Sequence, residues 1–328
     1  MFELTYLLVI NILHCNGASA DPQFPPGRKL VIDHDGGADD AMAIFMALLY
    51  EKYLNGWRYR RIFFNLLSIT SIVINNTSFI VFDVPIYRGS ERSLVISVPS
   101  DYFFGKDGLG DLENVEYQAI PAENLQAAIA LIELSKKYAG ELTIMAIGSL
   151  TNIAMAIRLD PQFIGRLLHL YVGAGHIYSE QQHKPEFNAE MDVEAYHMVA
   201  EGATPDKVTI MAFSQVMQSI NISLEWRIND LGGIPTKIMQ AQNDFERLSL
   251  AVSEHWYILD PVVAAATLDN NIITEVRNSE NSIILCGDQR GINTNNFMSA
   301  TPNTKIAYAY NSEYYQDLLI KTFSAEIK

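Results

Sequence analysis

The sequence predicts an α/β protein: an open, mostly parallel, Rossmann-like sheet flanked by helices in a single domain. Three observations predict this class. Short apolar runs alternate with helical patterns, the apolar runs end in small or polar residues, and no repeat or low-complexity linker divides the chain. At 328 residues and 49% hydrophobic, the chain is long and apolar enough to bury one large core.

The first twenty residues have the pattern of a signal peptide. Residues 4–13 form an apolar stretch too short to cross a bilayer, and residues 18–20 (ASA) fit a small-residue cleavage site. The basic residues that usually precede such a stretch are absent, which leaves a first buried strand or helix as the alternative. We predict that residues 1–20 are removed, that residues 21–328 form the mature domain, and that the protein is secreted.

Cysteine and sequon positions are compatible with secretion but add little to it. Cys286 is the one cysteine left after such a cleavage, so no intramolecular disulfide can form. N-glycosylation sequons begin at Asn75, Asn76 and Asn221, although such triplets are common by chance.

Charge and hydropathy narrow the classes of partner. The net charge of −15 argues against nucleic-acid binding and against docking on an anionic membrane. Residues 62–82 contain no charged residue, and their length would permit a transmembrane helix. Their Asn, Ser and Thr content and their β-branched residues favour two short strands instead, so we expect no stable membrane span.

The first predicted unit joins a strand, an acidic turn and a helix. KLVID (29–33) has the pattern of a buried strand, and DDAMAIFMALLYEKYL (39–54) follows as a helix with an almost continuous apolar face. Further along, ENLQAAIALIELSKKYAG (123–140) has the pattern of an amphipathic helix that ends in two lysines and a glycine.

The middle of the chain continues the alternation. Residues 149–161 form a helical pattern that Ser149 or Thr151 would cap and Pro161 would end. Such βαβ units form parallel sheets, whose ligands gather at the carboxyl ends of the strands. Three apolar runs supply the strands: ELTIMAIG (141–148), LLHLYVGAG (167–175) and KVTIMAFS (207–214).

The stretch DHDGGADD (33–40) places four carboxylates at the end of the first strand: Asp33, Asp35, Asp39 and Asp40. A helix N-terminus favours acidic residues, which accounts for one or two of them in a solvated turn. A hard cation such as Ca²⁺ takes about six to eight oxygen ligands and would turn their repulsion into attraction. The glycines let the chain fold back so that the acids face one point. The spacing favours a cation site over a solvated turn.

The stretch VIDHDGGADDAMAI (31–44) resembles the N-terminal signature of the nucleoside hydrolases, calcium-dependent enzymes that cleave the N-glycosidic bond of ribonucleosides. Later segments resemble further blocks of that family in the same order, over nearly everything from residue 29 onward except about residues 51–83. These segments are PIYRG (85–89), GKDGLGD (105–111), AIGSLTNIAMAI (146–157), LYVGAG (170–175), PEFNAEMDVEA (185–195) and WYILDPVVAA (256–265).

The resemblance implies the metal ligands and the general base. Asp35, Asp40 and Asp260 would bind Ca²⁺, together with the main-chain carbonyl of Ile147. Asp35 would also take a proton from a water molecule that the cation binds, because a bound cation lowers the pKa of water. From the residues alone, Asp260 ahead of a proline also fits a helix N-cap.

The resemblance also implies the substrate contacts. Asp39, Glu186 and Asn188 would hold ribose hydroxyls, with Asn76 as a further candidate from a loose match to the family's Gly-Asn-Thr block. Asp33 would brace the turn. The implied reaction converts purine or pyrimidine ribonucleosides to free base and ribose with inversion, and relatives commonly form dimers or tetramers.

Leu259 departs from the family in a way that bears on the chemistry. Many relatives carry His or Trp at this position, where it protonates or stacks on the leaving base. Trp256 and Tyr257 are the nearby candidates for stacking, although core packing is the commoner role of such aromatics.

Two further segments also depart from the family. Residues 51–83 nearly lack the helix expected after the Gly-Asn-Thr block and have the pattern of a replaced segment. His176 and His183 stand in the stretch where the family has a Gly-Asn pair for the 5′-hydroxyl. Their spacing matches no usual zinc pattern, so we expect solvated loop residues.

Two alternatives stay open beside the hydrolase. A catalytically impaired, secreted nucleoside-binding protein would keep the metal cage without the chemistry. A Mg²⁺-dependent phosphatase would use the Asp-x-Asp of residues 33–35 as its nucleophile, but the later lysine and acids that it needs stand in no recognisable block.

Overall fold

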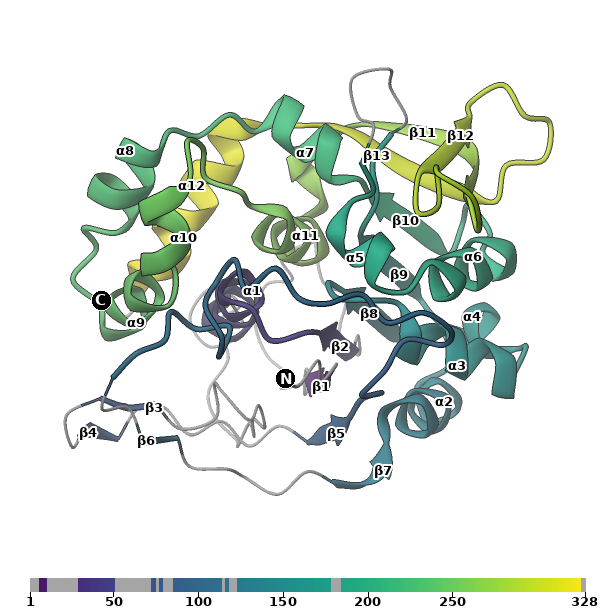
Figure 1. Cartoon of the computed structure of the whole chain (residues 1–328), viewed down its shortest axis with the longest axis horizontal. Helices are drawn as coiled ribbons and strands as arrows, with labels where there is room; N and C mark the ends of the chain where they lie inside the picture. Colours follow the sequence, from purple (N-terminus) through teal and green to yellow (C-terminus); the bar gives the residue numbers. More distant parts are fainter. Residues whose placement is uncertain are drawn as a thin grey trace, which may run out of the picture.

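The computed structural model describes residues 6–10, 29–50, 72–74, 77–78, 85–113, 116–117, 123–177 and 184–325 (Figure 1). Its main sheet contains β1 (Tyr6–Ile10), β2 (Lys29–His34), β5 (Ile86–Arg88), β7 (Glu123–Gln126), β8 (Leu142–Ala146), β9 (His169–Gly173), β10 (Val208–Met211), β11 (Ile273–Ile283), β12 (Asn293–Asn296) and β13 (Thr304–Tyr310). A small second sheet contains β3 (Ile72–Ile74), β4 (Thr77–Ser78) and β6 (Glu116–Tyr117).

Helices cover both faces of the main sheet (Figure 1). They are α1 (Ala38–Leu49), α2 (Ala127–Lys137), α3 (Thr151–Leu159), α4 (Phe163–Arg166), α5 (Phe187–Met191), α6 (Val193–Gly202), α7 (Phe213–Ser219), α8 (Leu224–Trp226), α9 (Lys237–Phe245), α10 (Arg247–Val252), α11 (Leu259–Leu268) and α12 (Ser312–Phe323). A π-helical turn spans Arg227–Leu231 and a 3₁₀ turn spans Asn270–Ile272.

The strand order in the main sheet is β12-β11-β13-β10-β9-β8-β2-β1-β5-β7. The run from β2 through β8, β9 and β10 to β13 is parallel throughout, whereas β11 and β12 add an antiparallel edge. Parallel strands with helical crossovers are what the alternating sequence pattern predicts. The predicted α/β class with a mostly parallel sheet is therefore confirmed.

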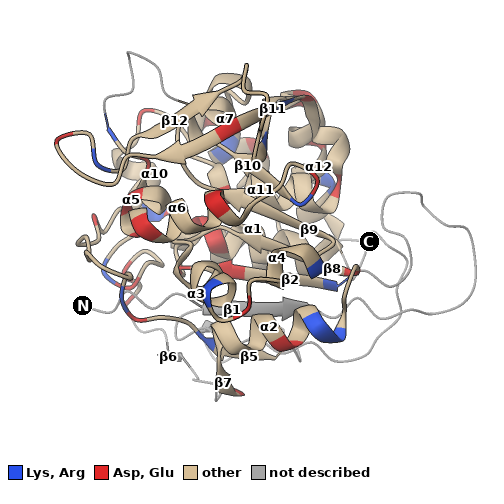
Figure 2. Ribbon diagram, turned by 90° about the vertical axis from the view of Figure 1, so that its right-hand side faces the viewer, with Lys and Arg blue, Asp and Glu red and all other residues tan. Residues whose placement is uncertain are grey.

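The core lies on both faces of the sheet because successive strand residues point to opposite sides. In β2, Leu30 and Ile32 pack with α1, α9, α11 and α12, while Val31 between them packs with α2, α3 and α6. The helices α1 and α11 are nearly continuously apolar and pack against each other. Helix α2 instead has a polar outer face and ends in Lys136 and Lys137, visible as its basic end in Figure 2.

Two local predictions are wrong. Residues 123–126 do not begin the helix predicted over 123–140. They form β7, because backbone pairing with β5 places them at the edge of the sheet. Neither Ser149 nor Thr151 caps α3, whose N-cap is Leu150. The Thr151 hydroxyl is instead directed to Asp192, to which it donates a hydrogen bond of 2.7 Å.

Strand β1 lies inside the segment predicted to be a signal peptide. It pairs antiparallel with β2 on one side and with β5 on the other. The rest of residues 1–20 lies outside the described residues, so the signal peptide stays a prediction. A cleavage after Ala20 would remove this strand from between β2 and β5.

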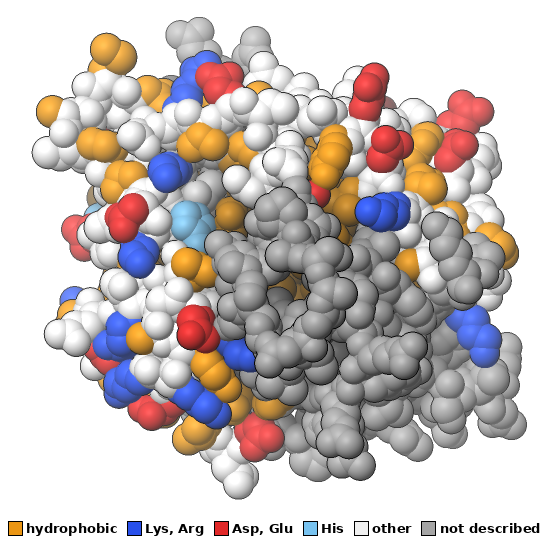
Figure 3. All heavy atoms as spheres, turned by 180° about the vertical axis from the view of Figure 1, so that it is seen from behind, with side chains coloured by type: hydrophobic (Ala, Val, Ile, Leu, Met, Phe, Trp, Pro, Cys, Tyr) orange, Lys and Arg blue, Asp and Glu red, His pale blue; other side chains and the backbone are white. Residues whose placement is uncertain are grey.

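Within the described ranges, no helix is both long enough and apolar enough to cross a membrane. The uncharged run 62–82 contributes the hairpin of β3 and β4, and its other residues lie outside the described part of the chain. The described surface seen in Figure 3 mixes acidic and basic side chains without a continuous basic patch.

Candidate active site

The candidate site is built at the carboxyl end of β2, where the chain turns into α1. Gly36 has a φ of +93°, a conformation that side-chain-bearing residues rarely adopt. A loop from residues 105–111 packs directly on this turn, since a Cβ at Gly108 would lie 2.8 Å from the Gly36 carbonyl oxygen. The Gly37 amide donates to Asp40 Oδ2 at 2.7 Å. The turn therefore aims the first residues of α1 back across the end of the strand.

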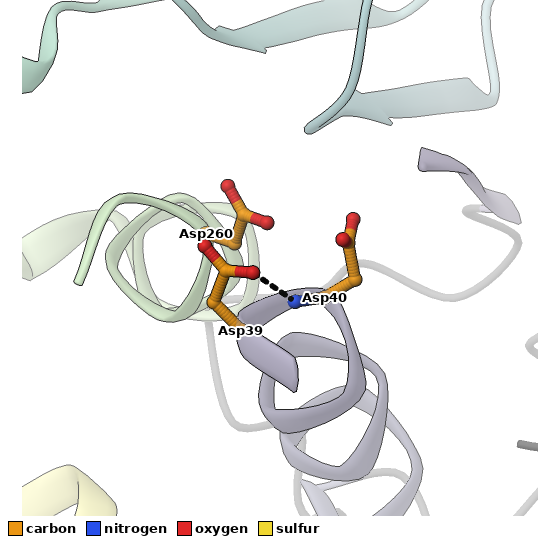
Figure 4. Close-up of side chains that lie close together, drawn as sticks. All are labelled: Asp39, Asp40 and Asp260. Atoms are coloured by element: carbon orange, nitrogen blue, oxygen red, sulfur yellow. Dashed lines mark hydrogen bonds between the residues drawn. The ribbon is translucent and has the colours of Figure 1, made fainter. Parts of the chain in front are cut away.

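Three carboxylates meet above the start of α1 (Figure 4). Asp39 and Asp40 come from α1 and Asp260 comes from the first turn of α11, and their ligand oxygens lie within 4.8 Å of one another. Asp40 and Asp260 are buried, and Asp39 accepts from the Asp40 amide at 3.2 Å. Asp260 is the second residue of its helix, whose N-cap is Ile258, so it is not a cap.

The electrostatics of this cluster are unfavourable for the polypeptide alone. Burial, followed by the charge of Asp35, raises the pKa of Asp39 to about 8. Burial and the neighbouring carboxylates raise the pKa of Asp40 and of Asp260 well above its usual range. Two ionised groups about 4 Å apart repel by about 4 kcal/mol at an effective dielectric constant of about 20.

The donor set fits a hard cation. All three groups offer carboxylate oxygens, and Asp40 Oδ1 is buried without a hydrogen-bond partner. Oxygen-only sets of this kind suit Ca²⁺ or Mg²⁺ better than zinc. A bound cation would compensate the charges that burial and repulsion otherwise disfavour.

Asp35 and Asp33 lie beside this cluster. The side chain of Asp35 interacts directly with that of Asp40, and burial raises the pKa of Asp35. Asp33 accepts a 2.8 Å hydrogen bond from Asn152 Nδ2, and its carbonyl accepts from the Ile147 amide at 2.8 Å. Asp33 thus ties the end of β2 to the segment after β8. Sequence reasoning did not single out Asn152, although an amide in the first turn of the helix that follows β8 was a usable signal.

The carbonyl predicted to bind the metal, that of Ile147, accepts from Asn188 Nδ2 at 3.1 Å. The same amide nitrogen donates to Gly173 at 2.9 Å, so Asn188 joins the ends of β8 and β9. A carbonyl oxygen has two lone pairs, so this contact leaves Ile147 able to bind a cation as well.

Glu186 is the N-cap of α5 and is buried. Its carboxylate accepts from the amides of Gly175 at 2.6 Å, Asn188 at 3.1 Å and Ala189 at 3.1 Å. The structure therefore brings Glu186 and Asn188 together at the ends of β8 and β9.

The two aromatic candidates for base stacking have different environments. Trp256 is buried and donates from its indole nitrogen to Glu246 at 2.9 Å, so its ring belongs to the core. Tyr257 is 38% exposed, and its ring centroid lies 6.0 Å from those of Phe103 and Phe213. Leu259 is buried in the core. Asn76 and His183 lie outside the described residues.

An arc of aromatic rings continues from Tyr257 in both directions. Phe103 contacts Phe104, and Phe104 lies against Gly37 of the acidic turn. On the other side, Phe213 contacts His176, with ring centroids 5.8 Å apart. His176 is half-buried rather than solvated, which corrects the prediction, and burial lowers its pKa to about 4. The arc forms an apolar wall next to an acidic cluster.

Comparisons with known proteins agree with this geometry. A family model for the inosine-uridine preferring nucleoside hydrolase matches residues 30–317. The chain is 26% identical to an inosine-uridine preferring nucleoside hydrolase of Leishmania major, covering 76% of this chain and 82% of that protein. It is 30% identical to uridine nucleosidase 1 of Arabidopsis thaliana, covering 80% of each. Among solved structures, the plant nucleoside hydrolase PpNRh1 matches with a TM-score of 0.72 at 21% identity, covering 92% of this chain and 100% of that one, which shows a shared fold.

Proposed function

Because the chain belongs to the inosine-uridine preferring nucleoside hydrolase family, we propose that its acidic cluster binds Ca²⁺ in support of the reaction of that family. The chain is an N-glycosidase that hydrolyses ribonucleosides to free base and ribose. One observation carries the metal proposal: three carboxylates with raised pKa values converge, Asp40 and Asp260 among them are buried, and Asp40 Oδ1 has no hydrogen-bond partner.

The ligands that we propose for the cation are Asp35, Asp40, Asp260 and the carbonyl of Ile147. Asp39 lies close enough to join them, although the resemblance assigns it to ribose. When bound, the cation supplies a Lewis acid that makes a water molecule more acidic and that orients hydroxyl groups. Asp35 takes the proton of the attacking water, because its side chain lies beside that of Asp40 at the carboxyl end of β2.

Ribose contacts come from residues at the ends of β8 and β9, beside the carbonyl of Ile147. Glu186 and Asn188 are held in place by hydrogen bonds to the backbone, which fixes their geometry before a substrate arrives. Asn188 donates both contacts through its nitrogen, so its oxygen remains to accept from a ribose hydroxyl. Acidic residues around the sugar stabilise the positive charge that develops on it in the transition state.

The leaving base lies against the aromatic arc in this proposal. Tyr257 is partly exposed and stands just before Asp260 in the sequence. The rings of Phe103 and Phe213 lie on either side of it. Leu259 carries no titratable group, and burial leaves His176 neutral at pH 7, so neither residue supplies an acid for the base. We therefore propose that the base leaves by protonation of its own ring from solvent.

Product analysis tests the function. Purified protein is incubated with inosine, adenosine or uridine, with Ca²⁺ or with chelator, and free base and ribose are separated by chromatography. We expect release of base from at least one nucleoside, dependent on Ca²⁺. Thermal stabilisation by nucleoside without any release would identify an impaired binding protein instead, and would contradict the hydrolase proposal.

We also propose that the protein is secreted after cleavage at Ala20. The sequon asparagine Asn221 is exposed between α7 and α8, which gives the proposal a chemical readout. Expression in a eukaryotic cell should release protein into the culture medium. That protein should begin at Asp21 and should lose mass at Asn221 on deglycosylation. Full-length protein retained in the cell, with residues 1–20 present, would contradict it.

A further inference from the structure

The segment from α9 to α10 contacts three separate parts of the chain that build the site. Gln242 Nε2 donates at 2.7 Å to the carbonyl of Ala38, the residue before Asp39. Arg247 donates at 2.6 Å to the carbonyls of Gly110 and Asp111, in the loop that packs on the acidic turn. Between these two residues, Glu246 contacts the segment that leads into α11.

Glu246 lies at the centre of a buried polar network. It accepts from Arg227 Nε at 2.9 Å, from Arg227 Nη2, and from Trp256 Nε1 at 2.9 Å. Arg227 also donates to Asn243 at 2.8 Å, and its guanidinium lies 5.5 Å from the centroid of the Trp256 ring. The side chains of Glu246 and Arg227 are 3% and 0% exposed. An ion pair this deeply buried has a fixed geometry, because each charge depends on its partner for compensation.

The network reaches the site through the segment that leads into α11. Trp256 precedes Tyr257 directly and stands four residues before Asp260. The hydrogen bond from Trp256 to Glu246 therefore fixes the short segment that carries both Tyr257 and Asp260.

We infer that Glu246 is a positioning residue for this site. Through Trp256 and Arg227, it holds the segment ahead of α11, so that Asp260 meets Asp39 and Asp40 and Tyr257 meets Phe103. The inference rests on the proposed function, because it assigns the network to cation and nucleoside binding. A purely structural network would contribute to the stability of the fold and leave ligand affinities unchanged.

The first variant removes one contact and keeps the ion pair. Trp256→Phe deletes the indole N–H while leaving an aromatic ring beside Arg227. We expect the Ca²⁺ dissociation constant, measured by calorimetry, to rise about 10-fold, within the range known for residues that orient metal ligands. At saturating Ca²⁺, we expect the KM for the nucleoside to rise as well, because Tyr257 moves with Trp256.

A second variant keeps the test valid if a single change at the ion pair prevents folding. In Arg227→Met with Glu246→Leu, apolar side chains replace both charges, a change that buried pairs often tolerate. We expect a folded protein with a somewhat lower melting temperature, because the indole N–H of Trp256 loses its acceptor, together with the same loss of Ca²⁺ affinity. The control is Arg166→Met, which breaks the Arg166–Asp160 ion pair near the opposite ends of the strands and should lower only the melting temperature.

The outcomes distinguish a failure of the positioning role of Glu246 from a failure of the proposed function. Wild-type protein that hydrolyses nucleosides, with both variants showing wild-type Ca²⁺ affinity and KM, would overturn the positioning role and leave the function intact. Wild-type protein that neither binds Ca²⁺ nor releases base would overturn the proposed function, and the positioning role with it.

Discussion

The two flanks of strand β2 are built very differently. On one side, β8, β9, β10 and β13 continue a parallel sheet with an unbroken register and a core on both faces. On the other side, β1 runs antiparallel, β5 has only three residues, and all four residues of β7 are exposed.

The site follows the regular flank. The acids and amides that converge on it come from the ends of β2, β8 and β9 and from α1, α3, α5 and α11. None of these described groups lies on β1, β5 or β7. Binding groups need rigid supports, and strands buried on both faces provide them. The described groups of the cluster thus lie on the regular flank, and we predict that cation binding does not depend on the irregular one.

The largest effect is expected from removing the proposed general base, Asp35, which lies on the regular flank. Asp35→Asn should lower kcat about 10³-fold, because a general base typically contributes about 10²–10⁴. Steady-state hydrolysis at saturating Ca²⁺ measures it. Glu123→Gln on β7, an exposed acid of the other flank, is the matched control and should leave kcat unchanged. Full activity of Asp35→Asn would refute its role.

The next effect concerns the aromatic wall. Tyr257→Ala should raise the KM for the nucleoside about 10-fold, since stacking of a base on an aromatic ring contributes about 1–3 kcal/mol. The Ca²⁺ dissociation constant should change little, because Tyr257 offers no ligand to the cluster. An unchanged KM would place the base elsewhere.

A third prediction concerns pH. Carboxyl groups with a raised pKa, such as Asp33 and Asp39 at about 8, keep protons in the folded chain that the unfolded chain has already released. Between about pH 4 and pH 8 these groups therefore bind more protons in the folded than in the unfolded state, and their contribution to the stability of Ca²⁺-free protein falls as pH rises. Ca²⁺ binds the ionised form, so it should raise the melting temperature by more degrees at pH 8 than at pH 5. Calorimetry at both values checks this, and a Ca²⁺ effect independent of pH would contradict it.

The smallest effect on the site is expected from the irregular flank. A chain that starts at Asp21 lacks β1 and leaves the edges of β2 and β5 unpaired, so a lower melting temperature than that of the full chain is expected. Its Ca²⁺ dissociation constant should stay within about 2-fold of the full-length value, because none of the proposed ligands lies on β1, which meets the site only through its pairing with Asp33 and His34. A large loss of affinity would show that the two flanks are coupled.

Periodicity and charge spacing were sufficient to predict the sheet class, the apolar helices and the acidic turn, because these depend on local patterns. They misplaced the start of α2, since residues 123–126 join a strand that is distant in sequence. Sequence reasoning also left Trp256 open as a stacking residue. In the structure its indole donates to Glu246. Which of two adjacent aromatic residues is buried and which is exposed depends on tertiary packing, which the sequence pattern does not contain.

The role of Glu246 was not predictable for the same reason. A charged residue between two short helices has the pattern of a solvated position, and its burial depends on Arg227, 19 residues earlier in the chain. Asp39 was assigned to ribose by resemblance, while the structure places it within ligand reach of Asp40 and Asp260. The spacing of the acids predicts that they converge on one point, but it does not show which of them bind the cation and which bind the substrate.

The central claim is that hydrolysis depends on a cation held by the cluster of α1 and α11. The most direct test titrates metal-stripped protein with Ca²⁺ and follows ribose release and Ca²⁺ binding in parallel. We predict that the rate rises in proportion to occupancy of one site, and that Asp260→Asn shifts both curves together to higher Ca²⁺. Full activity in the metal-stripped protein, or saturation with Ca²⁺ without any release of ribose, would contradict the account.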